Sequence, residues 1–175
     1  VDLTDIMSAN LFTGEENANS NFEVINLDEA NLTTLVGAEN VENFKKFAGE
    51  NKNIIKLTNL EDTDYNVTSN IGYKLTKETK YKFSVDVYTI GLRTEVEDAD
   101  LTKLGFGIKL TGFEESFVSK QSNNGWTTYT FYINPDNDVT SYLELSLGNA
   151  DLASSGVVCF GNIQFIESVE DTEFD

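Results

Sequence analysis

Short runs in which apolar and polar residues alternate recur along this chain, and three of them follow one another in its last third. In the run at 126–133, Tyr129, Phe131 and Ile133 fall on one face of a strand, because successive side chains of a strand point to opposite sides. Polar breakers separate this run from its neighbours. The pattern predicts about eight strands. They lie at 22–25, 53–57, 67–75, 81–90, 105–110, 126–133, 142–147 and 157–166.

The order of these runs indicates the fold class. Most strands follow one another through polar connections without a helical run between them, which favours an all-β sandwich of two antiparallel sheets over a βαβ arrangement. Residues 28–49 instead carry helical spacings, such as Leu32, Leu35 and Val36, and predict a loop with a short helix.

The chain divides into three predicted parts. Residues 1–20 are polar and rich in Asn, which predicts an N-terminal extension, and residues 168–175 are acidic, which predicts a tail or a linker to another module. The predicted sandwich module occupies residues 21–167. The chain has 175 residues, of which 39% are hydrophobic, and this is enough for one domain with a single core.

The chain is strongly acidic, and this narrows its range of partners. It has 30 Asp and Glu against 12 Lys and Arg, for a net charge of −18. This charge repels phosphate backbones and anionic lipids, so we expect neither nucleic acid nor a membrane surface as a partner. No apolar run approaches the ~18 residues of a membrane span. A neutral ligand, a cation and a basic protein surface remain as possible partners.

The sequence offers little for catalysis. It contains no His, which excludes Ser-His-Asp and Cys-His mechanisms and His-rich zinc sites. The one Cys, Cys159, lies in an apolar run where alternation turns it inward, so we expect a core residue rather than a reactive thiol. Carboxylate pairs arise by chance among 30 acidic residues, but a glycosidase needs a pair in a deep cleft, which a small sandwich seldom provides. We therefore predict that the chain is not an enzyme.

Four segments, read in order, resemble one family. They are 21–23 (Asn-Phe-Glu), 80–85 (Lys-Tyr-Lys-Phe-Ser-Val), 125–131 (Gly-Trp-Thr-Thr-Tyr-Thr-Phe) and 158–165 (Val-Cys-Phe-Gly-Asn-Ile-Gln-Phe). Their order and spacing resemble the galactose-binding-like jelly-roll carbohydrate-binding modules of bacterial secreted and cell-surface proteins. The resemblance implies a jelly-roll β-sandwich without catalysis of its own, glycan binding on a sheet face or in loops at one end, and often a structural calcium.

Outward aromatic residues beside polar ones are the candidates for sugar binding. An aromatic ring can lie against the apolar face of a pyranose while polar groups bond to its hydroxyls. Tyr132 and Tyr142 flank the predicted turn at 134–138 and face away from the core side of their strands. We expect them to share one surface with Glu144 and Lys109. Outward Tyr is also common in strands for β-propensity alone, so a solvated surface is the competing interpretation.

Two further aromatic positions complete this set. Tyr88 and Asp86 form a second outward pair, which we expect on the other sheet and also count as candidate carbohydrate-binding residues. Trp126 could serve as a stacking platform, but it stands at the start of a strand, and we expect it to be packed rather than to bind sugar.

Calcium is the one cofactor that the sequence suggests. The resemblance implies Glu23 as a ligand. Acidic stretches at 61–64, 95–100 and 134–138 also offer oxygen ligands of the kind that calcium takes. None of them matches a complete calcium-binding loop, and each is more typical of a solvated turn.

These observations predict a noncatalytic module that recognises a neutral glycan or polysaccharide through an exposed aromatic and polar sheet face. We expect it to be one module of a larger, multidomain bacterial protein that is secreted or held at the cell surface. The alternative is a structural or adhesin module of a bacterial surface protein, which spaces other domains or binds a protein partner.

Overall fold

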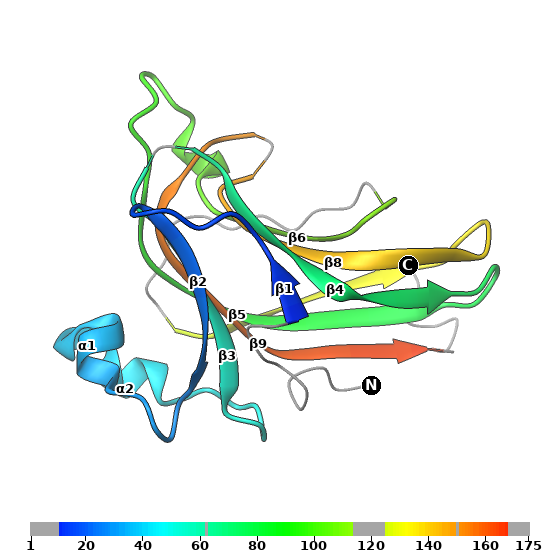
Figure 1. Cartoon of the computed structure of the whole chain (residues 1–175), viewed down its shortest axis with the longest axis horizontal. Helices are drawn as coiled ribbons and strands as arrows, with labels where there is room; N and C mark the ends of the chain where they lie inside the picture. Colours follow the sequence, from blue (N-terminus) through cyan, green and yellow to red (C-terminus); the bar gives the residue numbers. More distant parts are fainter. Residues whose placement is uncertain (1–10, 62, 114–124, 150, 168–175) are drawn as a thin grey trace.

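The computed structural model describes residues 11–61, 63–113, 125–149 and 151–167. These residues form two antiparallel sheets that stack face to face (Figure 1). The smaller sheet has the order β1 (Phe12–Thr13), β4 (Tyr65–Leu75), β8 (Val139–Leu147), β6 (Phe106–Leu110). The larger sheet has the order β2 (Ser20–Asn26), β3 (Asn53–Asn59), β9 (Ser155–Glu167), β5 (Tyr81–Arg93), β7 (Thr127–Ile133). Each of the predicted strands is present, and the predicted two-sheet sandwich is confirmed.

The main core fills the space between the sheets. The alternation in the sequence predicts its members correctly: Phe83 and Val85 of β5 are fully buried, and Phe106 and Ile108 of β6 face them from the smaller sheet. Burying each such side chain contributes about 1.5–3 kcal/mol relative to leaving it in water. The regular alternation of the strands thus supplies most of the driving force for stacking the two sheets.

The short strand β1 lies within the segment predicted to be an extension. Phe12 pairs with Ser69 of β4, and its side chain is 9% exposed and belongs to the main core. The sandwich therefore begins at or before Phe12 rather than at residue 21. Two residues carry too little periodicity to predict a strand, which explains why the pattern of the sequence did not reveal β1. The predicted acidic tail at 168–175 lies outside the described residues.

A short helical segment covers part of the outer face of the larger sheet, as residues 28–49 predict. It consists of α1 (Leu32–Val36), the 3₁₀ turn η3 (Ala38–Asn40) and α2 (Val41–Phe44). The Asn31 side chain accepts a 3.2 Å bond from the Thr34 amide and so starts α1. In Figure 1 these helices lie beside β2 and β3.

A second cluster of buried residues lies under this segment. Phe44 and Phe47 pack there against Ile54 of β3, Tyr88 of β5 and Cys159 of β9. The helical segment thus buries side chains that point away from the main core. As a result, only part of the outer face of the larger sheet is open to solvent.

Candidate functional site

The outer face of the smaller sheet is a polar surface with several exposed side chains, such as Lys74, Thr140 and Tyr142. On β8, Leu143, Leu145 and Leu147 point into the main core, so the residues between them point outward. Their partners on β4 and β6 follow from the strand register. We call this surface the β4–β8–β6 face; its residues are Asn66, Thr68, Gly72, Lys74, Gly107, Lys109, Thr140, Tyr142, Glu144 and Ser146.

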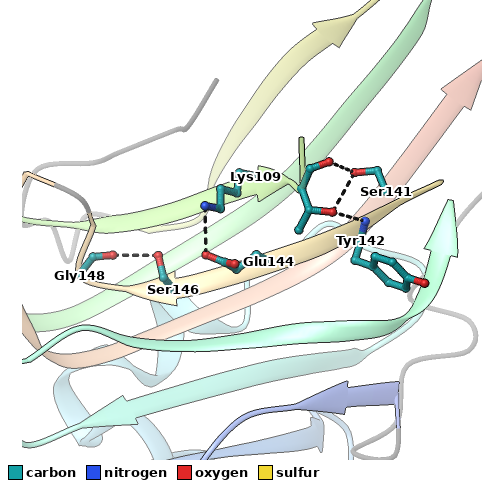
Figure 2. Close-up of polar contacts among 7 residues, drawn as sticks. Lys109, Ser141, Tyr142, Glu144, Ser146 and Gly148 are labelled. Atoms are coloured by element: carbon teal, nitrogen blue, oxygen red, sulfur yellow. Dashed lines mark hydrogen bonds and ion pairs between the residues drawn. The ribbon is translucent and has the colours of Figure 1, made fainter. Parts of the chain in front are cut away.

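Tyr142 is the aromatic residue of this face, and it is 40% exposed. It pairs with Gly72 on β4. A Cβ atom built at Gly72 would lie 3.3 Å from both Cε1 and Cζ of the Tyr142 ring. Figure 2 shows the side chain reaching out from β8. The ring therefore lies over Gly72, because the neighbouring strand has no side chain at this position. Much of the ring surface remains open to solvent.

The backbone of Tyr142 is fixed by Thr111, which follows β6. The Tyr142 amide donates to Thr111 Oγ1 at 2.9 Å, and the Thr111 amide donates to the Tyr142 carbonyl at 2.9 Å. The neighbouring Ser141 hydroxyl is fully buried and donates to the Thr111 carbonyl at 2.6 Å. Figure 2 shows the bonds made by the Ser141 hydroxyl and by the Tyr142 amide. They hold the base of the ring in place before any ligand arrives.

Hydrogen-bonding side chains lie beyond Tyr142 along β8. Lys109 Nζ lies 3.6 Å from Glu144 Oε1, and both side chains are partly exposed (Figure 2). Ser146 Oγ donates to the Gly148 carbonyl at 2.8 Å. The charged residues of the face are Lys74, Lys109 and Glu144, so two positive groups stand against one negative group although the whole chain has a net charge of −18. The face therefore offers donors and acceptors without a strong field of either sign.

A pocket of about 550 Å³ lies at the end of this face, beside the turn between β7 and β8. Thr140 and Thr111 form its edge towards Tyr142, and Phe113, Pro135 and Asn137 are among its other lining residues. Thr140 and Tyr142 are adjoining side chains, because both approach the same point above Gly72. The exposed aromatic ring and the pocket therefore form one continuous surface.

Of the four residues expected on one surface, three are brought together. Lys109, Tyr142 and Glu144 lie on the β4–β8–β6 face, but Tyr132 lies on β7, in the larger sheet, opposite Lys82 of β5. The expectation for Tyr132 is wrong because the chain crosses from one sheet to the other between β7 and β8. Alternation predicts which way a side chain points within its sheet, but it does not say which sheet a strand joins.

Tyr88 and Asp86 lie on the larger sheet, as expected, and point away from the main core, but both are covered. Tyr88 is fully buried, with its ring centre 5.0 Å from that of Phe44, and burial raises the pKa of its phenol. Asp86 is 5% exposed and accepts hydrogen bonds from Thr128 Oγ1 at 2.6 Å and Asn162 Nδ2 at 3.1 Å. The helical segment and neighbouring side chains therefore leave neither residue open to a glycan, which corrects their assignment as binding residues.

Trp126 is packed, as expected from its place at the start of a strand. Its ring centre lies 4.6 Å from that of Phe47 and 5.3 Å from that of Phe44. Its indole Nε1 donates to the Phe44 carbonyl at 2.9 Å. Through these contacts Trp126 holds the helical segment against the sheet, and its ring does not serve as a stacking platform for sugar.

Glu23, the calcium ligand implied by the resemblance, lies on the outer side of β2. Its carboxylate is 3.7 Å from the Lys56 ammonium, which is its neighbour on β3, and the next residue in that row is the buried Cys159. Calcium takes six to eight oxygen ligands, and these neighbours do not supply them. Within the described ranges, no three His, Cys, Asp or Glu side chains gather in one place. Calcium binding at Glu23 thus stays a prediction of the sequence, and we derive no role for it.

The sequence pattern alone did not reveal Gly72, Thr111 or the pocket as parts of a site. Gly72 interrupts the strand pattern at 67–75, and a glycine inside a strand can mark a close approach of another group. The composition at 134–138 predicts a turn and a candidate calcium-binding stretch, but it does not predict a pocket. Neither signal says which distant side chain comes close.

Comparisons with known proteins establish the fold. No protein-family model matches the sequence, and no curated protein matches it. An arabinose-bound GH51 α-L-arabinofuranosidase matches with a TM-score of 0.55 at 12% identity, over 92% of this chain and 24% of that one. This chain therefore spans about a quarter of the length of that enzyme.

Two smaller solved structures match over most of both chains. TmCBM61 in complex with β-1,4-galactotriose gives a TM-score of 0.49 at 9% identity, over 89% of this chain and 86% of that one. The CBM22-1 xylan-binding domain of a Paenibacillus barcinonensis protein gives 0.47 at 9% identity, over 93% and 89%. The two-sheet topology, together with the match to the arabinofuranosidase, confirms the jelly-roll fold. Among the described residues, no helix is both long and apolar enough to cross a bilayer.

Proposed function

We propose that this chain is a noncatalytic carbohydrate-binding module that binds a neutral glycan on the β4–β8–β6 face. The observation that carries the proposal is the Tyr142 ring, which extends over Gly72 and is 40% exposed among hydrogen-bonding side chains. A ring presented in this way can stack on the apolar face of a pyranose, and the backbone that carries it needs no ordering when a ligand binds.

The polar residues of the face complement such a ring. Glu144 lies two residues beyond Tyr142 on β8, about 7 Å away on the same face. Its cross-strand partner Lys109 on β6 adds a donor beside this acceptor. A sugar residue next to the stacked one can therefore bond to this pair through its hydroxyls. Affinity is expected to be modest, because the site is shallow and exposed to water.

The same residues argue against catalysis. Hydrolysis of a glycosidic bond needs two carboxyl groups about 5 to 10 Å apart. Glu144 is the one carboxylate that the strand register places on the β4–β8–β6 face, and it is paired with Lys109. A binding role fits a face with one aromatic ring and one acid better than a hydrolytic role does.

The setting in which this module works is part of the proposal. It binds glycan as one part of a larger bacterial protein that is secreted or held at the cell surface. The chain corresponds to about a quarter of the length of the arabinofuranosidase that it matches, as a module of a longer protein would. The single Arg, the absence of His and the abundance of Asn agree with a bacterial source of low GC content.

The test is a pull-down on insoluble polysaccharides and a glycan array, each with and without calcium, followed by calorimetry on the glycans that bind. Tyr142→Ala should weaken binding by at least about tenfold, which corresponds to ~1.4 kcal/mol. Tyr132→Ala is the matched control, because Tyr132 is a strand tyrosine on the outer side of the other sheet. It should bind as the unmodified protein does.

Two results would contradict the proposal. Loss of binding in Tyr132→Ala with retention in Tyr142→Ala would move the site to the larger sheet. No binding to any glycan in either condition would favour the structural or adhesin role. Circular dichroism of both variants checks that they remain folded.

A further inference from the structure

We infer that the pocket beside the β7–β8 turn is a second sugar subsite, which takes the terminal residue of a glycan, so that the module selects chain ends over chain interiors. This inference rests on the proposed function of the β4–β8–β6 face. Beyond that function, it specifies which part of the glycan is bound, the chain end, and which residues bind it, those of the pocket.

The position of the pocket is the first step. Thr140 lines the pocket and is two residues from Tyr142 on the same face of β8, a distance of about 7 Å along the strand. Thr111 lines it as well and bonds to the backbone of Tyr142. A glycan that lies along β8 with one residue on the Tyr142 ring therefore reaches the pocket with its next residue.

The lining of the pocket is the second step. Phe113, Pro135 and Val139 give it apolar walls, whereas Asn134 and Asn137 add amide groups that both donate and accept. A sugar ring needs this combination, since it has apolar faces and hydroxyls at its rim. The volume of about 550 Å³ falls within the range of small-molecule sites.

The β7–β8 turn at the end of the pocket away from Tyr142 is the third step, and it is the reason for preferring a chain end. Pro135 is buried, and Phe113 packs against the main core between the sheets. The turn is also fixed from behind, because the Lys77 amide donates to Asp138 Oδ1 at 2.8 Å and the Glu78 amide donates to the Pro135 carbonyl at 3.0 Å. A glycan that extends from the Tyr142 ring into the pocket therefore runs against this fixed turn.

The experiment compares binding to the same mass of polysaccharide before and after hydrolysis, which increases the number of chain ends. Soluble xylan, galactan, mannan and mixed-linkage β-glucan are each titrated by calorimetry, intact and after partial acid hydrolysis. For a polysaccharide that binds, the number of sites per gram should rise with the number of ends that hydrolysis creates. A module that binds chain interiors shows no such rise.

Variants test the residues. Asn137→Trp places a large ring at the exposed rim of the pocket and should weaken binding by about tenfold, or ~1.4 kcal/mol. Glu97→Trp is the matched control; residue 97 is exposed in the loop after β5, whereas the pocket lies near Tyr81, where β5 begins. Asn137→Ala removes the amide without adding bulk, and a severalfold loss there supports the same conclusion if the Trp variant does not fold.

The outcomes separate the two proposals. Binding that depends on Tyr142, with unchanged sites per gram after hydrolysis and full affinity in both Asn137 variants, overturns the pocket subsite and leaves the proposed function intact. Absence of binding to all probes overturns both. A rise in sites per gram together with loss in the Asn137 variants supports the subsite.

Discussion

At the scale of single residues, Gly72 determines how the candidate site is presented. Its φ is not in the left-handed region, so its backbone would accept other residues. What it lacks is space: a Cβ there would come within 2.6 Å of the Thr140 methyl and 3.3 Å of the Tyr142 ring. We therefore regard Gly72 as a positioning residue for Tyr142.

Replacing Gly72 with Ala should displace the Tyr142 ring and weaken glycan binding severalfold. Gly107→Ala is the control; Gly107 is also a strand glycine on this face, but its nearest neighbour is the Ser146 hydroxyl. Calorimetry on both variants measures the effect. The double variant Gly72→Ala/Tyr142→Ala should bind no worse than Tyr142→Ala alone, because Gly72 acts through the ring. An additive loss would contradict that role.

Because of Cys159, the free energy of unfolding should decrease as the pH rises through the alkaline range. It is fully buried, and burial raises the pKa of its thiol from 9.0 to about 12. Below pH 9 both the folded and the unfolded chain keep this proton, so the stability is complete there. Between pH 9 and pH 12 the unfolded chain loses the proton and the folded chain keeps it. The free energy of unfolding should then fall by up to about 1.4 kcal/mol per pH unit.

Urea unfolding between about pH 8 and pH 10 measures this slope. Cys159→Ala should be flatter over the same range, whatever its stability at neutral pH. Buried phenols add a similar fall only at higher pH, since the pKa values of Tyr65 and Tyr73 are raised from 10.0 to about 12. Identical slopes for the two proteins would show that the thiol is not the cause.

At the scale of elements, the helical segment at residues 32–44 depends on aromatic contacts with the sheet rather than on its own length. Helices this short are not stable alone in water. Trp126 contacts Phe44, Phe47 and Tyr88, and it also bonds to the Phe44 carbonyl. These contacts hold the segment over the second buried cluster.

Trp126→Ala should therefore lower the free energy of unfolding by about 3 kcal/mol, the order seen for large aromatic truncations. Trp126→Phe keeps ring contacts and loses the hydrogen bond, so it should cost about 1 kcal/mol. Denaturant unfolding followed by circular dichroism gives both values. Glycan binding by the folded Trp126→Phe variant should be unchanged, and a loss of binding would bring Trp126 into the site.

At the scale of the whole molecule, the charge of −18 is unevenly distributed. The β4–β8–β6 face has Lys74 and Lys109 against Glu144, whereas the chain as a whole is strongly acidic. A neutral ligand on this face gains little from long-range electrostatics. We expect the overall charge to repel polyanions.

Affinity for a neutral glycan should accordingly change by less than about twofold between ~0.05 and ~0.5 M salt, because screening acts on charge pairs and not on stacking. Calorimetry at several salt concentrations checks this. Heparin and DNA should not bind at any of these concentrations. A steep loss of glycan affinity with salt would instead indicate that the ligand is charged.

The strands and their inward faces could be predicted from the sequence because side-chain alternation is a local property of the backbone. The inward positions Phe83, Phe106 and Phe131 were predicted in this way, and so was the position of the helical segment. The loss of alternation at 28–49 is likewise visible without any knowledge of contacts. The jelly-roll fold followed from the order of these elements together with the family resemblance.

The tertiary structure alone decided which outward residues form a site. Tyr132 and Tyr142 look equivalent in the sequence, but their strands lie in different sheets. Tyr88 looks as exposed as Tyr142, but a segment distant in the chain covers it. Strand partners and coverage depend on contacts between residues far apart in the sequence, and periodicity contains no information about such contacts. For the same physical reason, only the folded chain shows the Tyr142 ring above Gly72.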